Sequence, residues 1–173
     1  MKSSARIIQA SGEFTGSTLL INYLVGFFCP QSAAIFGVDA NIKDNLITKT
    51  HYLELDDFKK RFDSQYDLWF VSSHRESDPA RPKRVFRNLD RKYFSRKNVL
   101  IIDFNRLRDT NYIFDSFLNF FPSNLIPNQN HELTKQQMLS RIEAMNKRYS
   151  EISSLPRSYV DPIYGLHGSH RKS

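Results

Sequence analysis

Short runs with the composition of buried strands alternate along this chain with segments of helical periodicity, and this alternation constrains the fold most. The strand-like runs span residues 5–10, 46–51, 67–73 and 98–104. Most are continuously apolar, which is typical of parallel strands that are buried on both faces. Strands that alternate with helices favour a parallel sheet with helices on both sides. We therefore predict an α/β fold with three layers, α/β/α, around a central parallel sheet.

Apolar residues at helical spacing locate the predicted helices. These span residues 19–27, 55–62, 82–93, 113–121 and 138–149. Ser17 or Thr18 is the predicted N-cap of the first helix, and the third helix follows Pro82 and buries Val85. Residues 29–45 and the tail, residues 153–173, lack a period and predict loops. The length suits one domain, so we expect residues 1–173 to form a single domain.

Composition disfavours several classes of protein. The single cysteine, Cys29, rules out a disulfide framework and a multi-cysteine zinc site, and no other set of residues predicts a metal site. The longest apolar stretch, residues 19–28, is interrupted by Asn22 and Gly26 and is too short to cross a bilayer. No secretory signal is visible at the N-terminus. We therefore expect a cytoplasmic protein with no membrane partner.

The chain is basic, with a net charge of +7, which predicts an anionic partner. Lysines and arginines crowd residues 81–97, where Asp90 is the only acidic residue. A solvated helix face explains such a run, and so does a nucleic-acid-binding module. A module of that kind needs exposed aromatics among its cations for base stacking, whereas the aromatics here fall partly on the predicted apolar stripe. Nucleic acid is therefore the less favoured partner.

Polar side chains directly follow each predicted strand. The carboxyl ends of parallel strands share one edge of a sheet, and ligands bind there. The first of these segments, residues 11–18, has two glycines and four hydroxyl residues ahead of a helix. Such a loop can turn its N–H groups toward an anion at the positive end of the helix dipole. We therefore expect a P-loop-like strand-loop-helix unit, although an ordinary turn has the same composition.

This loop differs from a nucleotide P-loop in two respects. The pattern G-x-x-x-x-G-K-[ST] has four residues between its glycines, whereas Gly12 and Gly16 are separated by three. Ser17 stands where that pattern has its lysine. These differences disfavour an ATP or GTP hydrolase. A nucleotide-dependent phosphotransferase is the second enzymatic alternative, but no carboxylate pair is evident to hold Mg²⁺.

The ends of the second and third strands carry ionisable side chains. Lys49 and His51 are two residues apart, so both project from the same face of a strand. Histidine titrates near neutral pH, and a base beside a cation suits proton abstraction next to an anionic group. His74 and Arg75 end the third strand, and the planar fork of arginine suits a phosphate. A structural histidine and a surface ion pair of Arg75 are the alternatives.

Together these segments resemble the sulfotransferases that use 3′-phosphoadenosine 5′-phosphosulfate (PAPS). Four features match in order over most of the chain. The segment Phe14-Thr15-Gly16-Ser17-Thr18-Leu19-Leu20 is similar to the family's phosphosulfate loop, and Lys49-Thr50-His51 is similar to its Lys-Thr-His. Residues 67–75 are similar to the strand that ends at the arginine for the 3′-phosphate. Residues 99–109 and the Phe-rich helix are similar to the family's late strand and the helix that follows it. The tail, residues 165–172, is similar to the loop that closes over the nucleotide.

The resemblance implies an enzyme that transfers a sulfuryl group from PAPS to the hydroxyl of a carbohydrate or small molecule, without a metal. It implies that Lys49 stabilises the departing phosphate and that His51 takes the proton of the acceptor. The residues implied to bind the donor are Thr15, Gly16, Ser17 and Thr18 at its 5′ end, and Arg75, Ser77, Lys83, Arg171 and Lys172 at its 3′-phosphate.

Two departures from the family's pattern affect these roles. Phe14 stands where the family has Lys or Arg, so either Lys49 suffices or the protein is a weak or inactive relative of the family. Lys83 stands where many members have a serine that joins the 3′-phosphate arginine, and Ser77 lies nearer in sequence. The chain is also short for the family. Acceptor recognition could therefore fall to residues 81–97, which would suit an acidic glycan, or to a second copy in a homodimer.

Overall fold

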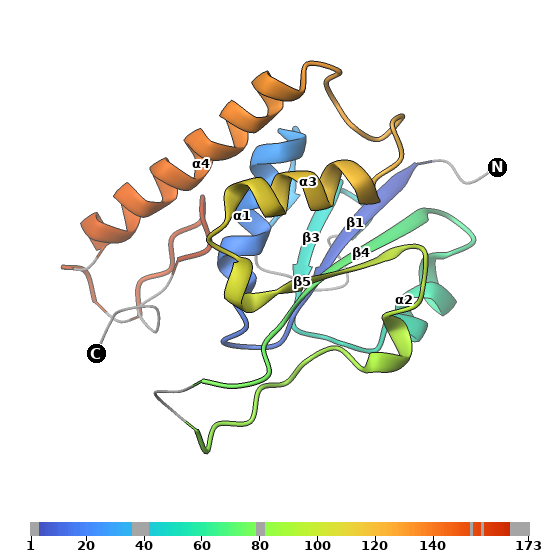
Figure 1. The fold of residues 1–173 in the computed structure, drawn as a ribbon, viewed down its shortest axis with the longest axis horizontal. Helices are drawn as coiled ribbons and strands as arrows, with labels where there is room; N and C mark the ends of the chain where they lie inside the picture. The colour runs from blue at the N-terminus through green and yellow to red at the C-terminus, as the bar shows by residue number, and fades with distance from the viewer. Residues whose placement is uncertain (1–3, 36–41, 79–81, 153, 157, 167–173) are drawn as a thin grey trace.

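The computed structural model describes residues 4–35, 42–78, 82–152, 154–156 and 158–166, and over these residues the chain forms a parallel sheet with helices on both faces (Figure 1). Five parallel strands lie in the order β2-β3-β1-β4-β5 within this part of the chain. They are β1 (Ala5–Ala10), β2 (Ala33–Ala34), β3 (Ile47–Thr50), β4 (Asp67–His74) and β5 (Val99–Asp103). The predicted α/β fold with a central parallel sheet is confirmed.

Helices cover the two faces of the sheet unequally. Figure 1 shows α1 (Ser17–Phe28), α3 (Thr110–Phe120) and α4 (His131–Ile152) on one side and α2 (Leu55–Phe62) on the other. Ile7 of β1 packs toward Phe27 and Phe117 in the larger core. Its neighbour Ile8 points to the opposite core, where it packs toward Phe58 of α2. Both isoleucines are fully buried, because β1 lies inside the sheet and helices cover both of its faces there.

A glycine brings α4 close to α1. A Cβ built on Gly26 would lie 2.8 Å from the Cα of Met138, so a larger residue here would separate the two helices. Met138 is fully buried in the core that α1 forms with the sheet. The described part of the tail packs against α4, where Arg148 Nε donates to Asp161 Oδ2 over 2.6 Å. The first half of α4 therefore lies against the end of α1, and the cluster that joins Met145 to Leu19 brings the second half of α4 near the start of α1.

The predicted helix at residues 82–93 is wrong. Residues 82–90 form no helix, and only Arg91–Tyr93 make a short 3₁₀ turn, η2. Asn88 explains the difference, because its side chain accepts from Arg75 N over 2.9 Å and donates to Arg75 O over 2.7 Å. These bonds hold the segment, without a helix, beside the residue that follows β4. Val85, predicted to be buried, is 93% exposed.

The loop after β1 lies at the point where the chain changes direction across the sheet. β1 has β3 on one side and β4 on the other. The chain therefore passes from β1 through α1 to one neighbour and returns later to the other, and a crevice opens at the carboxyl ends of such strands. The predicted N-cap of α1, Ser17 or Thr18, is wrong, since Gly16 takes this position. No helix among the described residues is long and apolar enough to span a membrane.

Candidate functional site

Buried hydroxyl groups fasten the loop between β1 and α1 to the sheet. Ser11 Oγ accepts from Ser73 N of β4 over 2.9 Å, and Thr15 Oγ1 donates to Gly12 O over 2.7 Å. Ser73 Oγ also donates to Thr15 Oγ1 over 3.2 Å. Ser11 and Thr15 are both fully buried. Their side chains therefore hold the loop in shape, and the hydroxyl of Thr15 faces the protein interior.

Two residues with positive φ curl this loop onto the start of α1. Phe14 has φ 61° and Gly16 has φ 81°. A Cβ on Gly16 would also lie only 2.3 Å from Leu107 Cδ1, so both the conformation and the space require glycine. No side chain caps the N-terminus of α1 at Gly16. The first turn of α1 therefore presents backbone N–H groups and the positive end of the helix dipole.

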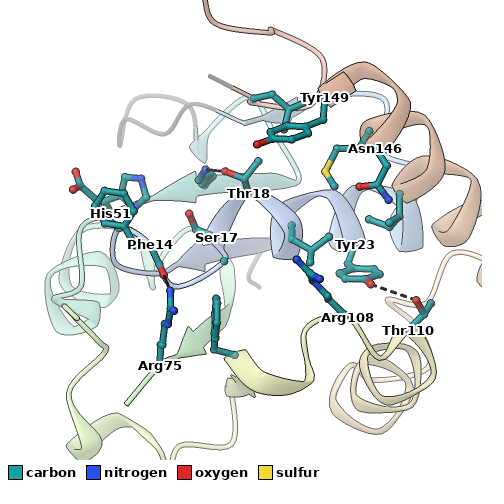
Figure 2. A pocket seen from close by; sticks show the side chains of 18 residues that line it. Phe14, Ser17, Thr18, Tyr23, His51, Arg75, Arg108, Thr110, Asn146 and Tyr149 are labelled. Atoms are coloured by element: carbon teal, nitrogen blue, oxygen red, sulfur yellow. Dashed lines mark hydrogen bonds between the residues drawn. The ribbon is translucent and has the colours of Figure 1, made fainter. Parts of the chain in front are cut away.

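A cavity of about 940 Å³ opens over this helix start (Figure 2). It brings together six of the sequence-predicted site residues, namely Gly16, Ser17, Thr18, Lys49, His51 and Arg75. Thr15 does not line the cavity, and neither do Ser77 and Lys83, which are exposed. Arg171 and Lys172 lie outside the described residues. The chain thus joins the ends of β1, β3 and β4 in one concave site, as expected for a parallel sheet.

Lys49 is a buried cation at the end of β3. Its Nζ donates to Thr18 Oγ1 over 3.1 Å, which directs the ammonium group at the first turn of α1. Burial lowers the pKa of Lys49 from 10.5 to about 8. A cation held in such a place interacts strongly with an anion, because little water screens the charge.

His51 points into the cavity from the residue after β3 (Figure 2). Its Nδ1 lies 2.6 Å from the carbonyl oxygen of Ser11. A carbonyl oxygen only accepts, so the proton of a neutral ring resides on Nδ1 and the lone pair on Nε2. The loop backbone thereby orients the ring as a proton acceptor.

Arg75 follows β4 and is held by aromatic rings and an acidic neighbour. Its guanidinium carbon lies 4.0 Å from the ring centroid of Phe104 and 4.4 Å from that of Phe86. Nη1 donates to Phe14 O over 3.0 Å, and Nη2 pairs with Asp78 Oδ2 over 2.8 Å. An ion pair with Asp78, considered from the sequence as a surface contact, is therefore present, but both side chains are largely buried and Arg75 also lines the cavity.

Sequence analysis did not predict five polar lining residues that lie outside the loop between β1 and α1. They are Tyr23 on α1, Arg108 and Thr110 around the start of α3, and Asn146 and Tyr149 on α4 (Figure 2). Arg108 comes five residues after β5, beyond a 3₁₀ turn, η3 (Phe104–Arg106). Sequence analysis considered only residues that directly follow a strand and therefore did not predict it. Only the packing of α4 on α1 brings Asn146 and Tyr149 here, and no local sequence signal could have found them.

No family model matches the chain, and no curated protein or solved structure shows significant similarity to it. Among the described residues, no group of three or more histidines, cysteines and carboxylates is placed to hold a metal ion.

Proposed function

We propose that this protein is a PAPS-dependent sulfotransferase acting on an acceptor hydroxyl. One observation carries the proposal. The uncapped N-terminus of α1, the buried cation Lys49, the oriented imidazole of His51 and Arg75 all line a single cavity. Sulfuryl transfer resembles phosphoryl transfer in requiring an in-line arrangement and neutralisation of spreading negative charge. The resemblance of the loop, of Lys49-Thr50-His51 and of the strand leading to Arg75 supports the same conclusion.

The residues present fit a nucleotide donor that carries negative charge at both its 5′ end and its 3′-phosphate. The cavity volume of about 940 Å³ lies within the range of roughly 300–1,000 Å³ that is common for ligand pockets. Basic side chains from β3, the end of β4 and the residues before α3 line its wall, and Phe104 gives it an apolar surface. The donor supplies the sulfuryl group when bound. Ser17 and Thr18 would bind its 5′ end with the first-turn amides, Lys49 would neutralise charge there, and Arg75 would bind the 3′-phosphate.

His51 would accept the proton of the acceptor hydroxyl at Nε2. The hydrogen bond from Nδ1 to Ser11 O fixes the ring orientation and stabilises the imidazolium that proton transfer creates. Ser77 and Lys83 do not line the cavity, so they are left out of this proposed site.

The first test is selective stabilisation by adenosine 3′,5′-bisphosphate, the product nucleotide. A ligand at 100 times its Kd adds about 2.7 kcal/mol to the free energy of unfolding, which raises the Tm of a chain of this size by roughly 5–10 °C. We expect this shift with the bisphosphate and a smaller one with ATP, measured by thermal denaturation. A larger shift with ATP would support a phosphotransferase instead. Stabilisation by DNA that is lost steeply with salt would support a nucleic-acid-binding module.

Asp78 competes with any anion that binds Arg75, because the two side chains form an ion pair. Replacing Asp78 by asparagine removes this competition, and we expect Asp78→Asn to bind the bisphosphate about threefold to tenfold more tightly in calorimetric titration. Asp115→Asn is the matched control, since it removes one exposed carboxylate on α3, away from the cavity. Equal affinities of the two variants would show that Arg75 does not contact the ligand.

A further inference from the structure

The loop that starts α1 has no cation of its own. Its only charged residue, Glu13, is acidic and lines the cavity. An anion held at the first turn of α1 therefore meets an unfavourable charge on the loop, which a nearby cation must offset. Lys49 lies on the inner side of this turn, where it bonds Thr18. Phe14 belongs to the loop itself and lines the same cavity.

Phe14 holds an arginine from a distant part of the chain against this loop. Its φ of 61° turns the side chain outward, where it is 47% exposed while still lining the cavity. The guanidinium carbon of Arg84 lies 3.6 Å from the centroid of the Phe14 ring. Stacking uses the face of the guanidinium and leaves the N–H groups at its edge able to donate.

Arg84 differs from Arg75 in its electrostatic surroundings. Arg75 is paired with Asp78, whereas no described acidic residue forms an ion pair with Arg84. Its guanidinium carbon lies over the ring of Phe14 and 5.9 Å from the ring centroid of Phe86. An arginine held on aromatic rings without a carboxylate keeps its full charge for a ligand.

The backbone fixes the segment that carries Arg84 beside the loop. A Cβ on Gly12 would lie 1.6 Å from the carbonyl oxygen of Arg87, so these two segments of the chain touch at a position where only glycine fits. Asn88 ties the same segment to the backbone of Arg75 through two hydrogen bonds. The non-helical path of residues 82–90 thus places Arg84 against the ring of Phe14, which lines the cavity, although Arg84 is not itself a lining residue.

We infer that Arg84 supplies the cation that the loop itself lacks and binds the 5′-phosphate end of the nucleotide, with Phe14 as its platform. This inference rests on the proposed function, because it concerns the same ligand. It assigns a role to the unusual Phe14 and to one member of the basic run at residues 81–97.

The test compares Arg84→Ala with Arg87→Ala in calorimetric titrations with adenosine 3′,5′-bisphosphate. Losing one charge-assisted contact should weaken binding about tenfold in Arg84→Ala. Arg87→Ala removes an equal charge three residues away but keeps the backbone and Cβ that lie against Gly12, and its affinity should stay within about twofold of wild type. Thermal denaturation without ligand checks that both variants are folded.

A second substitution moves the cation onto the loop. Phe14→Lys in the Arg84→Ala background should restore most of the lost affinity, whereas Phe14→Leu alone should reproduce the loss because Arg84 loses its platform. A wild-type protein that does not bind the bisphosphate overturns the proposed function and this inference together. A wild-type protein that binds it, with Arg84→Ala binding equally well, overturns this inference alone.

Discussion

Replacing His51 by alanine should lower sulfuryl transfer about 10²- to 10⁴-fold, the usual contribution of a positioned general base. The Nε2 lone pair, directed by the bond from Nδ1 to Ser11 O, is the proton acceptor that the variant lacks. Binding of adenosine 3′,5′-bisphosphate should change less than about threefold, since Lys49, Arg75 and the α1 amides remain. Transfer is measured with a radiolabelled sulfate donor over a panel of glycans, and binding by calorimetry.

Two further variants separate a chemical role of His51 from a structural one. His51→Asn can still donate to the Ser11 carbonyl but has no basic nitrogen, so it should be as inactive as alanine while keeping the Tm of wild type. His131→Ala is the matched control, because His131 is exposed at the start of α4, away from the cavity. Turnover by His51→Asn near the wild-type rate would refute the role of base.

The elements of the fold were largely predictable because burial on two faces leaves a strong local pattern. The run at residues 5–10 coincides with β1, where Ile7 and Ile8 face different cores. The predicted helix at residues 113–121 begins three residues after α3 begins and ends one residue after α3 ends, since Ile113 and Phe117 recur on the buried side of α3. In both elements the residues that define the period are also the ones that pack.

The apolar pattern at residues 82–90 wrongly predicted a helix, because contacts with residues outside the segment decide its conformation. Phe86 and Leu89 are buried as a helical stripe would require. The hydrogen bonds of Asn88 to Arg75 and the cap that Asp90 gives to Lys92 N fix a non-helical path instead. A helical pattern over so few residues cannot outweigh these long-range bonds.

The candidate site was predictable to the extent that it follows one rule of topology. Lys49 and His51 end β3 and Arg75 follows β4, and these two strands flank β1 in parallel, so the sheet alone brings all three residues to one edge. The place of Asn146 in the site could not be predicted in this way, because it depends on how α4 packs on α1. Ser77 and Lys83 were assigned by sequence spacing alone, and the path of the chain after β4 leaves both exposed.

Lys49 should make nucleotide binding depend on pH in a defined direction. Its lowered pKa of about 8 means that the side chain is charged below this pH and neutral above it. A bound anion favours the charged form, so affinity is highest below pH 8 and falls as the pH rises through 8. The stability of the ligand-free protein depends on pH in the opposite direction. Between pH 8 and 10.5 the unfolded chain binds the proton more tightly, so the free energy of unfolding rises with pH across that window.

Calorimetric titrations with adenosine 3′,5′-bisphosphate from pH 7.5 to 9.5 test this prediction, because phosphate monoesters, with a second pKa of about 6, are already fully ionised there. Wild-type affinity should fall about tenfold or more across this range, since up to one proton is taken up on binding. Lys49→Met should bind about 10- to 100-fold more weakly than wild type at pH 7.5 and lose most of the pH dependence. Lys49→Arg stays charged at every pH used, so its affinity should remain nearly constant. An unchanged slope in Lys49→Met would assign the titration to another group and remove Lys49 from the site.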